Sequence, residues 1–295
     1  MNRSIIACAI GTALLAPAVH AAQTGIISSN AFNPAISLIL DGRYSQFSND
    51  PETYHLPGFQ LGPESGPGER GFAFHEAELQ ISSNVDDMFY GNAVISLGND
   101  AGETATEIEE AWIQTLDLPD GLVVKAGKLF SRAGYLNERH THSWDFADAP
   151  LVTRAFFGGN LADSGVQLRW VAPTDLYLEL GGEWFAGDSW PAAGAGYRGR
   201  GLHTLYAKLG GDYDDSNSWQ LGVSQVVAQA VDRSDAPTDP SMPPPLAFTG
   251  DSDVTGVDFV WKWAPNGNFK DRNLAFSAEY MRRTEHGTLA TDFGG

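Results

Sequence analysis

Connections of two different lengths alternate along this chain, and this ordering restricts the fold more than any other feature of the sequence. The short connections are turns at residues 84–87, 117–121, 172–175, 210–216 and 266–267. The long ones cover residues 48–71, 98–105, 131–163, 186–200 and 229–252. Transmembrane β-barrels sort their connections in this way, with short turns on one side of the membrane and long loops on the other. A soluble β-sandwich has no reason to do so.

Between these connections, apolar and polar residues alternate. Val257, Phe259 and Trp261, for example, alternate with Asp258 and Lys262. Because successive side chains of a strand point to opposite faces, each segment would have one apolar and one polar face. The pattern gives eleven strands between residues 36 and 280. Together with the connection lengths it predicts an all-β fold, a transmembrane antiparallel up-and-down β-barrel of the porin-like kind.

Closing such a barrel requires an even number of strands. With eleven strands and no aromatic strand at the end of the chain, we expect a barrel that is incomplete at its C-terminus, as in a fragment of a larger one. A twelve-stranded barrel, closed by a strand from residues 22–34 or from the tail, is the alternative. The predicted organisation is a signal peptide at 1–21, a periplasmic lead at 22–34 and the barrel at 35–295.

The N-terminus has the pattern of a secretory signal peptide. Arg3 supplies the positive charge, residues 5–18 form an apolar stretch, and Val19-His20-Ala21 places small residues at the cleavage positions. A buried N-terminal helix is the alternative. Cys8, the only cysteine, lies inside this segment, so the mature chain would contain neither a disulfide nor a thiol nucleophile. The expected location is the outer membrane of a Gram-negative cell.

The charge balance excludes one class of partner. The sequence has 37 acidic and 18 basic residues, a formal net charge of −19, whereas nucleic-acid binding needs basic patches. An acidic chain attracts cations instead. The expected partners are outer-membrane lipid and lipopolysaccharide, together with small solutes or metal ions. The sequence neither predicts nor excludes assembly into a homotrimer.

Tryptophans near strand ends suggest an aromatic girdle at the membrane interface. We expect six of them on the apolar face: Trp112, Trp170, Trp184, Trp219, Trp261 and Trp263. Packing in an ordinary protein core is the alternative for any one of them.

Charged residues on the polar face are candidates for lining a pore. The acidic candidates are Glu76, Glu78, Glu107 and Glu109, and the basic candidates are Arg43, Lys125 and Arg169. Acidic rings at a constriction favour cations; the alternative is an ordinary hydrated inner face. We expect the loop at 131–163 to fold into the barrel as a constriction, because it carries the apolar residues Leu151, Phe156 and Phe157. Packing against neighbouring loops or against another protomer is the alternative.

The same loop contains a candidate metal site. His140 and His142 lie near Glu138 and Asp145 in sequence, and imidazole with carboxylate suits zinc and other transition metals. Zinc is therefore the only cofactor that the sequence suggests. Two solvated loop histidines are the alternative.

Two segments resemble known families. The hairpin of residues 109–115 and 122–130, which includes the run VVKAGK, resembles the porin superfamily, in particular the phosphate-selective porin O/P type. Its turn predicts that Glu110 lies opposite Lys128. Residues 134–146 resemble small proteins labelled zinc-regulated TonB-dependent outer-membrane receptors, and that resemblance implies metal-linked uptake.

The sequence thus predicts an outer-membrane channel for passive passage of small hydrophilic solutes, with a preference for cations. The alternative is a zinc- or metal-linked uptake receptor without a plug domain. A barrel enzyme is a third class, but no serine or other nucleophile is placed with a base in this sequence, so we expect no catalytic residues.

Overall fold

The computed structural model describes residues 34–62, 65–100, 103–195, 201–234 and 246–291, together with the backbone of residues 9–13. Eleven antiparallel strands follow one another in a single sheet: β2 (Ala35–Ser45), β3 (Gly71–Asn84), β4 (Phe89–Asp100), β5 (Glu103–Thr115), β6 (Leu122–Phe130), β7 (Ala162–Val171), β8 (Tyr177–Phe185), β9 (Leu202–Asp214), β10 (Asn217–Arg233), β11 (Leu246–Trp263) and β12 (Leu274–Thr291). The predicted all-β, up-and-down order is confirmed.

Among the residues that the structure describes, helical structure is confined to short pieces. They are η1 (Pro51–Thr53), η2 (Pro119–Gly121), η3 (Thr141–Ser143), η5 (Pro265–Gly267) and the seven-residue helix α1 (Leu151–Phe157). Among the described residues, no helix combines the length and the apolar character that crossing a bilayer would require.

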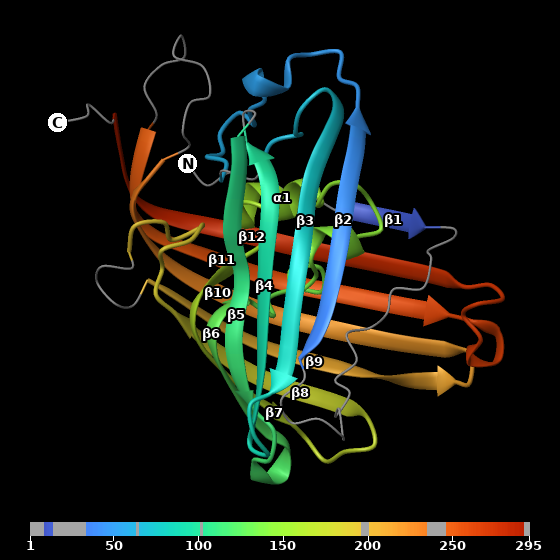
Figure 1. Cartoon of the computed structure of the whole chain (residues 1–295). Coiled ribbons are helices and arrows are strands. Elements are labelled where there is room, and N and C mark those ends of the chain that lie inside the picture. Colours follow the sequence, from blue (N-terminus) through green and yellow to red (C-terminus); the bar gives the residue numbers. More distant parts are fainter. Residues whose placement is uncertain are drawn as a thin grey trace.

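The sheet curls strongly but stays open. In Figure 1 the early strands β2–β5 run steeply across the late strands β10–β12, with α1 between the two groups. Within the described residues no pairing joins β2 to β12, so the predicted barrel closure is not present in this part of the chain. The outer edge of β12 instead pairs with β1 (Ala9–Ala13), which lies inside the predicted signal peptide. The other residues of that peptide, and the lead at 22–33, lie outside the described residues.

Three predicted connections are too long. The first is the predicted long connection at 98–105, where β4 continues to Asp100, β5 begins at Glu103 and these two residues pair. Residues 229–252 were expected to form a loop, but β10 continues to Arg233 and β11 begins at Leu246. The polar composition there is misleading, because Gln229 pairs with Asp251 and the ladder continues. Likewise β9 and β10 pair as far as Asp214 and Asn217, which leaves a two-residue turn in place of the predicted turn at 210–216.

The two faces of the sheet have inverted polarity. On the outer, convex face, Phe72 is 91% exposed and Leu205 is 62% exposed. On the inner, concave face, Glu179 and Glu183 are fully buried and Lys208 is 1% exposed. The charged side chains therefore face inward and the large apolar ones face outward, as the period-two pattern predicted.

Five of the six tryptophans share the outer rows with exposed apolar residues; Trp219 and Trp261, for instance, pair across β10 and β11 beside the exposed Leu221 and Phe259. Trp112 does not. It packs against the buried core, and its indole N–H donates to the inner-face Glu110 at 3.1 Å. The prediction that Trp112 belongs to an outer girdle is wrong, because a bulge in β5 places this residue on the inner face.

The connection between β6 and β7, residues 131–161, folds onto the inner face, and we call it the inner loop. Its base is held by Asn137, whose side-chain N–H groups donate to Ser131 O and Leu161 O at 2.8 and 2.9 Å. Helix α1 within the loop buries Phe156 and Phe157 against side chains of the late strands. Gly158 ends the helix with φ 74°, a left-handed conformation that favours glycine.

Candidate functional site

The inner loop meets the early strands through two histidines. His140 Nδ1 lies 2.9 Å from Glu109 Oε2 and 3.7 Å from Glu78 Oε2, and its Nε2 lies 3.2 Å from Glu110 Oε2. His142 Nδ1 lies 2.7 Å from Glu78 Oε1. The two imidazole rings are stacked with centroids 5.7 Å apart. Each oxygen of the Glu78 carboxylate thus faces one histidine.

Glu76 completes the group, because it accepts a hydrogen bond from the Thr141 hydroxyl at 2.5 Å. We call the set the histidine–glutamate cluster: Glu76, Glu78, Glu109, Glu110, His140 and His142. Three overlapping sets of ligand atoms here lie within 4.8 Å of one another: Asp41, His75 and Glu76; Glu76, Glu78 and His142; Glu78, Glu109 and His140.

Two β-bulges build this part of the wall. In β3 the pairing skips His75, between Asp41 opposite Glu76 and Gly42 opposite Phe74. In β5 it skips Glu109, between Val94 opposite Glu110 and Ile95 opposite Ile108. A bulge re-aims side chains locally. Glu109 and Glu110, which are consecutive and would otherwise face opposite sides, therefore both reach His140.

His140 is strongly affected by these neighbours. Burial disfavours its charged form, but the hydrogen bonds that its ring nitrogens donate to Glu109 and Glu110, together with the charges of Glu110 and Glu78, outweigh burial and raise its pKa to about 10. The raised pKa favours the imidazolium form of His140 between these carboxylates, and the cluster ties the inner loop to the wall.

A second ion-pair network ties the inner loop to β8 and β9. Arg132 Nη1 lies 2.5 Å from Glu138 Oε2, and Arg132 Nε lies 2.8 Å from Glu179 Oε1. Lys208 Nζ on β9 lies 3.3 Å from Glu138 Oε1. Although burial opposes both shifts, the mutual attraction raises the pKa of Arg132 and lowers that of Glu138.

The predicted metal ligands are thus only partly brought together. His140 and His142 lie side by side, but Glu138 belongs to the Arg132 network and Asp145 lines a separate hollow. The carboxylates that face the histidines are instead ones that the sequence suggested for a pore, Glu78 and Glu109, together with Glu110. No local signal identifies Glu110, because its position depends on the bulge.

The remaining predicted pore residues lie along the same inner surface. Arg43 Nε pairs with Asp41 at 3.1 Å, Arg169 approaches Glu179 at 3.7 Å, and Lys125 Nζ lies 4.1 Å from the centroid of the Trp112 ring. The predicted register of Glu110 opposite Lys128 is wrong by one residue. Lys128 pairs with Ala111, and its ammonium reaches Glu107 at 2.9 Å.

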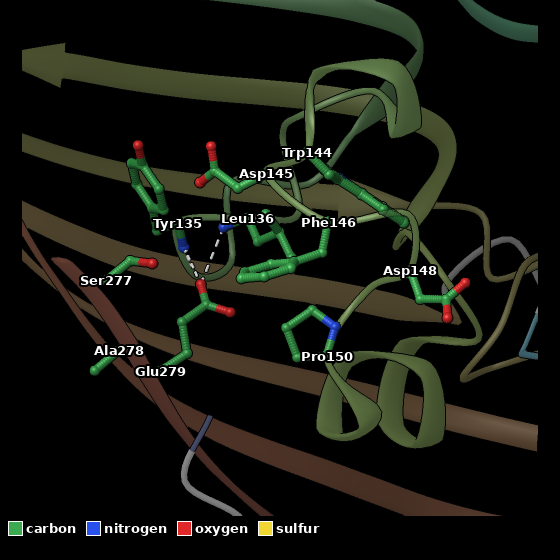
Figure 2. Close-up of a pocket in the computed structure, with 10 residues that line it drawn as sticks. All are labelled: Tyr135, Leu136, Trp144, Asp145, Phe146, Asp148, Pro150, Ser277, Ala278 and Glu279. Atoms are coloured by element: carbon green, nitrogen blue, oxygen red, sulfur yellow. Dashed lines mark hydrogen bonds between the residues drawn. The ribbon is translucent and has the colours of Figure 1, made fainter. Parts of the chain in front are cut away.

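Two hollows flank the inner loop away from the cluster. One, of about 270 Å³, lies between the loop and β12; Figure 2 shows Trp144, Asp145 and Phe146 around it, with the backbone N–H groups of Tyr135 and Leu136 donating to Glu279. The other, of about 470 Å³, is lined by residues that include Arg132, Glu138 and Lys262. The inner loop therefore narrows the interior without filling it.

No protein-family model matches the chain. A protein of Aquifex aeolicus (strain VF5), described as an uncharacterized protein, is 35% identical over 287 residues, which cover 91% of this chain and 59% of that protein. The chain thus spans 59% of that relative's length. A solved structure described as "Asymmetric conductivity of engineered proteins" aligns with 85% of this chain and 100% of its own at 11% identity and a TM-score of 0.23, too low to bear on the fold.

Proposed function

We propose that the chain forms the wall and constriction of an outer-membrane channel through which small hydrophilic solutes pass passively, with a preference for cations. The inverted polarity of the sheet carries this proposal. A protein in water gains stability by burying its apolar residues, whereas the sheet here buries many charged side chains on its inner face and exposes many large apolar ones on its outer face. In a lipid bilayer the outer face should be apolar instead of polar, which makes this arrangement favourable.

The extent of the apolar surface supports the same proposal. Exposed apolar residues recur on the outer face from β2, with Ile36 at 67%, to β12, with Tyr280 at 41%. Soluble monomers rarely expose contiguous apolar patches beyond roughly a few hundred Å². A surface that spans the whole sheet suits contact with acyl chains.

The ends of the strands suggest an orientation. Trp170, Trp219, Trp261 and Trp263 lie on strands close to the short turns. Tryptophan favours the membrane interface, and short turns face the periplasm in barrels of this type. The long connections, including the inner loop, would then start from the external side.

The inner loop supplies the proposed constriction. It contacts β3 and β5 through the histidine–glutamate cluster, and it contacts β8 and β9 through Arg132 and Glu138. A solute would pass the carboxylates of the cluster on one side and the Arg132–Glu138–Lys208 ion pairs on the other. With a formal net charge of −19 over the chain, the field favours cations.

Single-channel recording of the full chain in planar bilayers, in a KCl gradient and with a chelator present, tests this proposal. We expect steady conductance steps and a reversal potential of the sign that cation selectivity requires. Glu107→Gln should reduce that selectivity, because Glu107 is a half-exposed inner carboxylate. Asp215→Asn, in the β9–β10 turn, is the matched control and should not. Absence of steps, or anion selectivity, would contradict the proposal.

A further inference from the structure

We propose that a divalent transition-metal ion of the zinc class binds at Glu78, Glu109 and His140 and fastens the inner loop to the channel wall. Glu76 and His142 form a neighbouring set of donors, which has Glu78 in common with this site. The inference concerns binding alone, so it does not depend on the chain's conducting ions.

The spacing of the donor atoms fits a tetrahedral ion. With metal–ligand distances of roughly 2.0–2.2 Å, neighbouring donors around zinc lie about 3.3 Å apart. His140 Nδ1 lies 2.9 Å from Glu109 Oε2 and 3.7 Å from Glu78 Oε2. These separations bracket the required value, so sub-ångström movements of the side chains would form the site.

The partner of the second ring nitrogen of His140, Nε2, supports a metal on the Nδ1 side of the ring. Histidines that bind metals almost always direct the other ring nitrogen to a carboxylate, carbonyl or water, which fixes the ring and makes it a better ligand. His140 directs Nε2 to Glu110 at 3.2 Å while Nδ1 faces Glu78 and Glu109. Glu110 on Nε2 thus orients the imidazole ring, and Nδ1 points to the carboxylates that would share the metal with it.

The negative charge of the cluster also favours a bound cation. Glu76, Glu78, Glu109 and Glu110 face the cluster, and within the described residues no lysine or arginine nitrogen lies within ion-pair distance of them. A divalent ion on Nδ1 would take the place of an imidazolium proton of His140 and would add one further positive charge beside these carboxylates. Mixed imidazole and carboxylate donors suit zinc, iron or cobalt better than calcium or magnesium, which prefer oxygen alone.

The donors also come from three separate parts of the chain. Glu78 lies on β3, Glu109 on β5 and His140 on the inner loop. A metal here would crosslink the loop to two strands and would oppose its displacement from the wall.

Titration of the chelator-treated full chain in detergent with Zn²⁺ by calorimetry, and with Co²⁺ by visible absorption, tests the site. We expect saturable binding of at least one equivalent and cobalt bands of the four-coordinate type. Glu78→Gln, Glu109→Gln and His140→Asn should each weaken binding at least tenfold. His55→Asn and Asp145→Asn, which alter exposed residues outside the cluster, are controls and should bind as the unaltered protein does.

A second readout separates ligation from folding. Zn²⁺ should slow trypsin cleavage within the inner loop of the unaltered protein and should not do so in Glu109→Gln, whose circular dichroism spectrum should be unchanged. Absence of saturable binding, or equal binding by Glu78→Gln and His140→Asn, would overturn the metal site. The bilayer recording with chelator tests the channel separately, so either proposal can fail alone.

Discussion

At the scale of single residues, the interior depends on charges that satisfy one another. Glu179 is fully buried; it accepts hydrogen bonds from the Arg132 side chain at 2.8 Å and from the Tyr177 hydroxyl at 2.5 Å. Removing one partner of a buried ion pair leaves the other charge without compensation, which costs far more than losing an exposed pair. The inner face therefore tolerates its many charges only as a connected network.

Arg132→Met should for this reason destabilise the protein by roughly 3–5 kcal/mol, the range for breaking a buried ion pair. Lys128→Met removes the more exposed pair with Glu107 and should cost at most about 1 kcal/mol. Urea unfolding in detergent, followed by tryptophan fluorescence, measures both. Equal midpoints for the two variants would show that the Arg132 network contributes little to stability.

At the scale of elements, the inner loop is held by packing as well as by charge. Helix α1 places Phe157 in the core with 2% exposure, whereas Leu151 at its start is 46% exposed. The ion pairs fix the first half of the loop, and the phenylalanines fix its second half against the late strands. The position of the constriction thus depends on a seven-residue helix too short to be stable alone.

Phe157→Ala should cost about 3–5 kcal/mol, as large-to-small changes of buried aromatics do. Its effect should be local: trypsin should cleave faster after Arg139 and Arg154, and channel noise should increase as the loop moves. Leu151→Ala, on the same helix, is the matched control and should change cleavage little. If the two variants are cleaved at the same rate, the helix does not hold the loop.

At the scale of the whole molecule, inverted polarity is the property that separates a lipid-facing sheet from a soluble one. Val223 on β10 is 48% exposed near the middle of the outer face, and Tyr213 on β9 is 85% exposed close to the short turns. In water both positions would accept a lysine with little effect, since both side chains are already exposed. In a bilayer Val223 would lie deeper in the hydrocarbon region than Tyr213.

Val223→Lys should therefore destabilise the chain in lipid vesicles by about 2–4 kcal/mol, while Tyr213→Lys should cost roughly 0–1 kcal/mol. Urea unfolding from vesicles, with the fraction folded read by gel mobility, measures the difference. A neutral Val223→Lys would indicate that the outer face does not contact acyl chains.

The sequence alone determined the order of the strands, the two faces of most strands and the positions of most connections; the alternation of short and long connections fails between β4 and β5, where Asp100 pairs with Glu103. These properties are local: a period of two decides which side a residue faces, and turn residues decide where a strand ends. They fixed the inward position of Glu78 and the outward position of Phe259 before any contact was known. The predicted signal peptide remains a sequence-level prediction.

Only the tertiary structure decided which charges meet. His140 contacts Glu109, 31 residues away in sequence, and His142 contacts Glu78, 64 residues away. The bulge at Glu109 shifts the register by one residue, and such a shift moves side chains to the opposite face without leaving a sequence signal. Glu110 and Trp112 therefore face inward. Glu138 pairs with Arg132 and Lys208 instead of joining the histidines, because the folded loop places it beside β9.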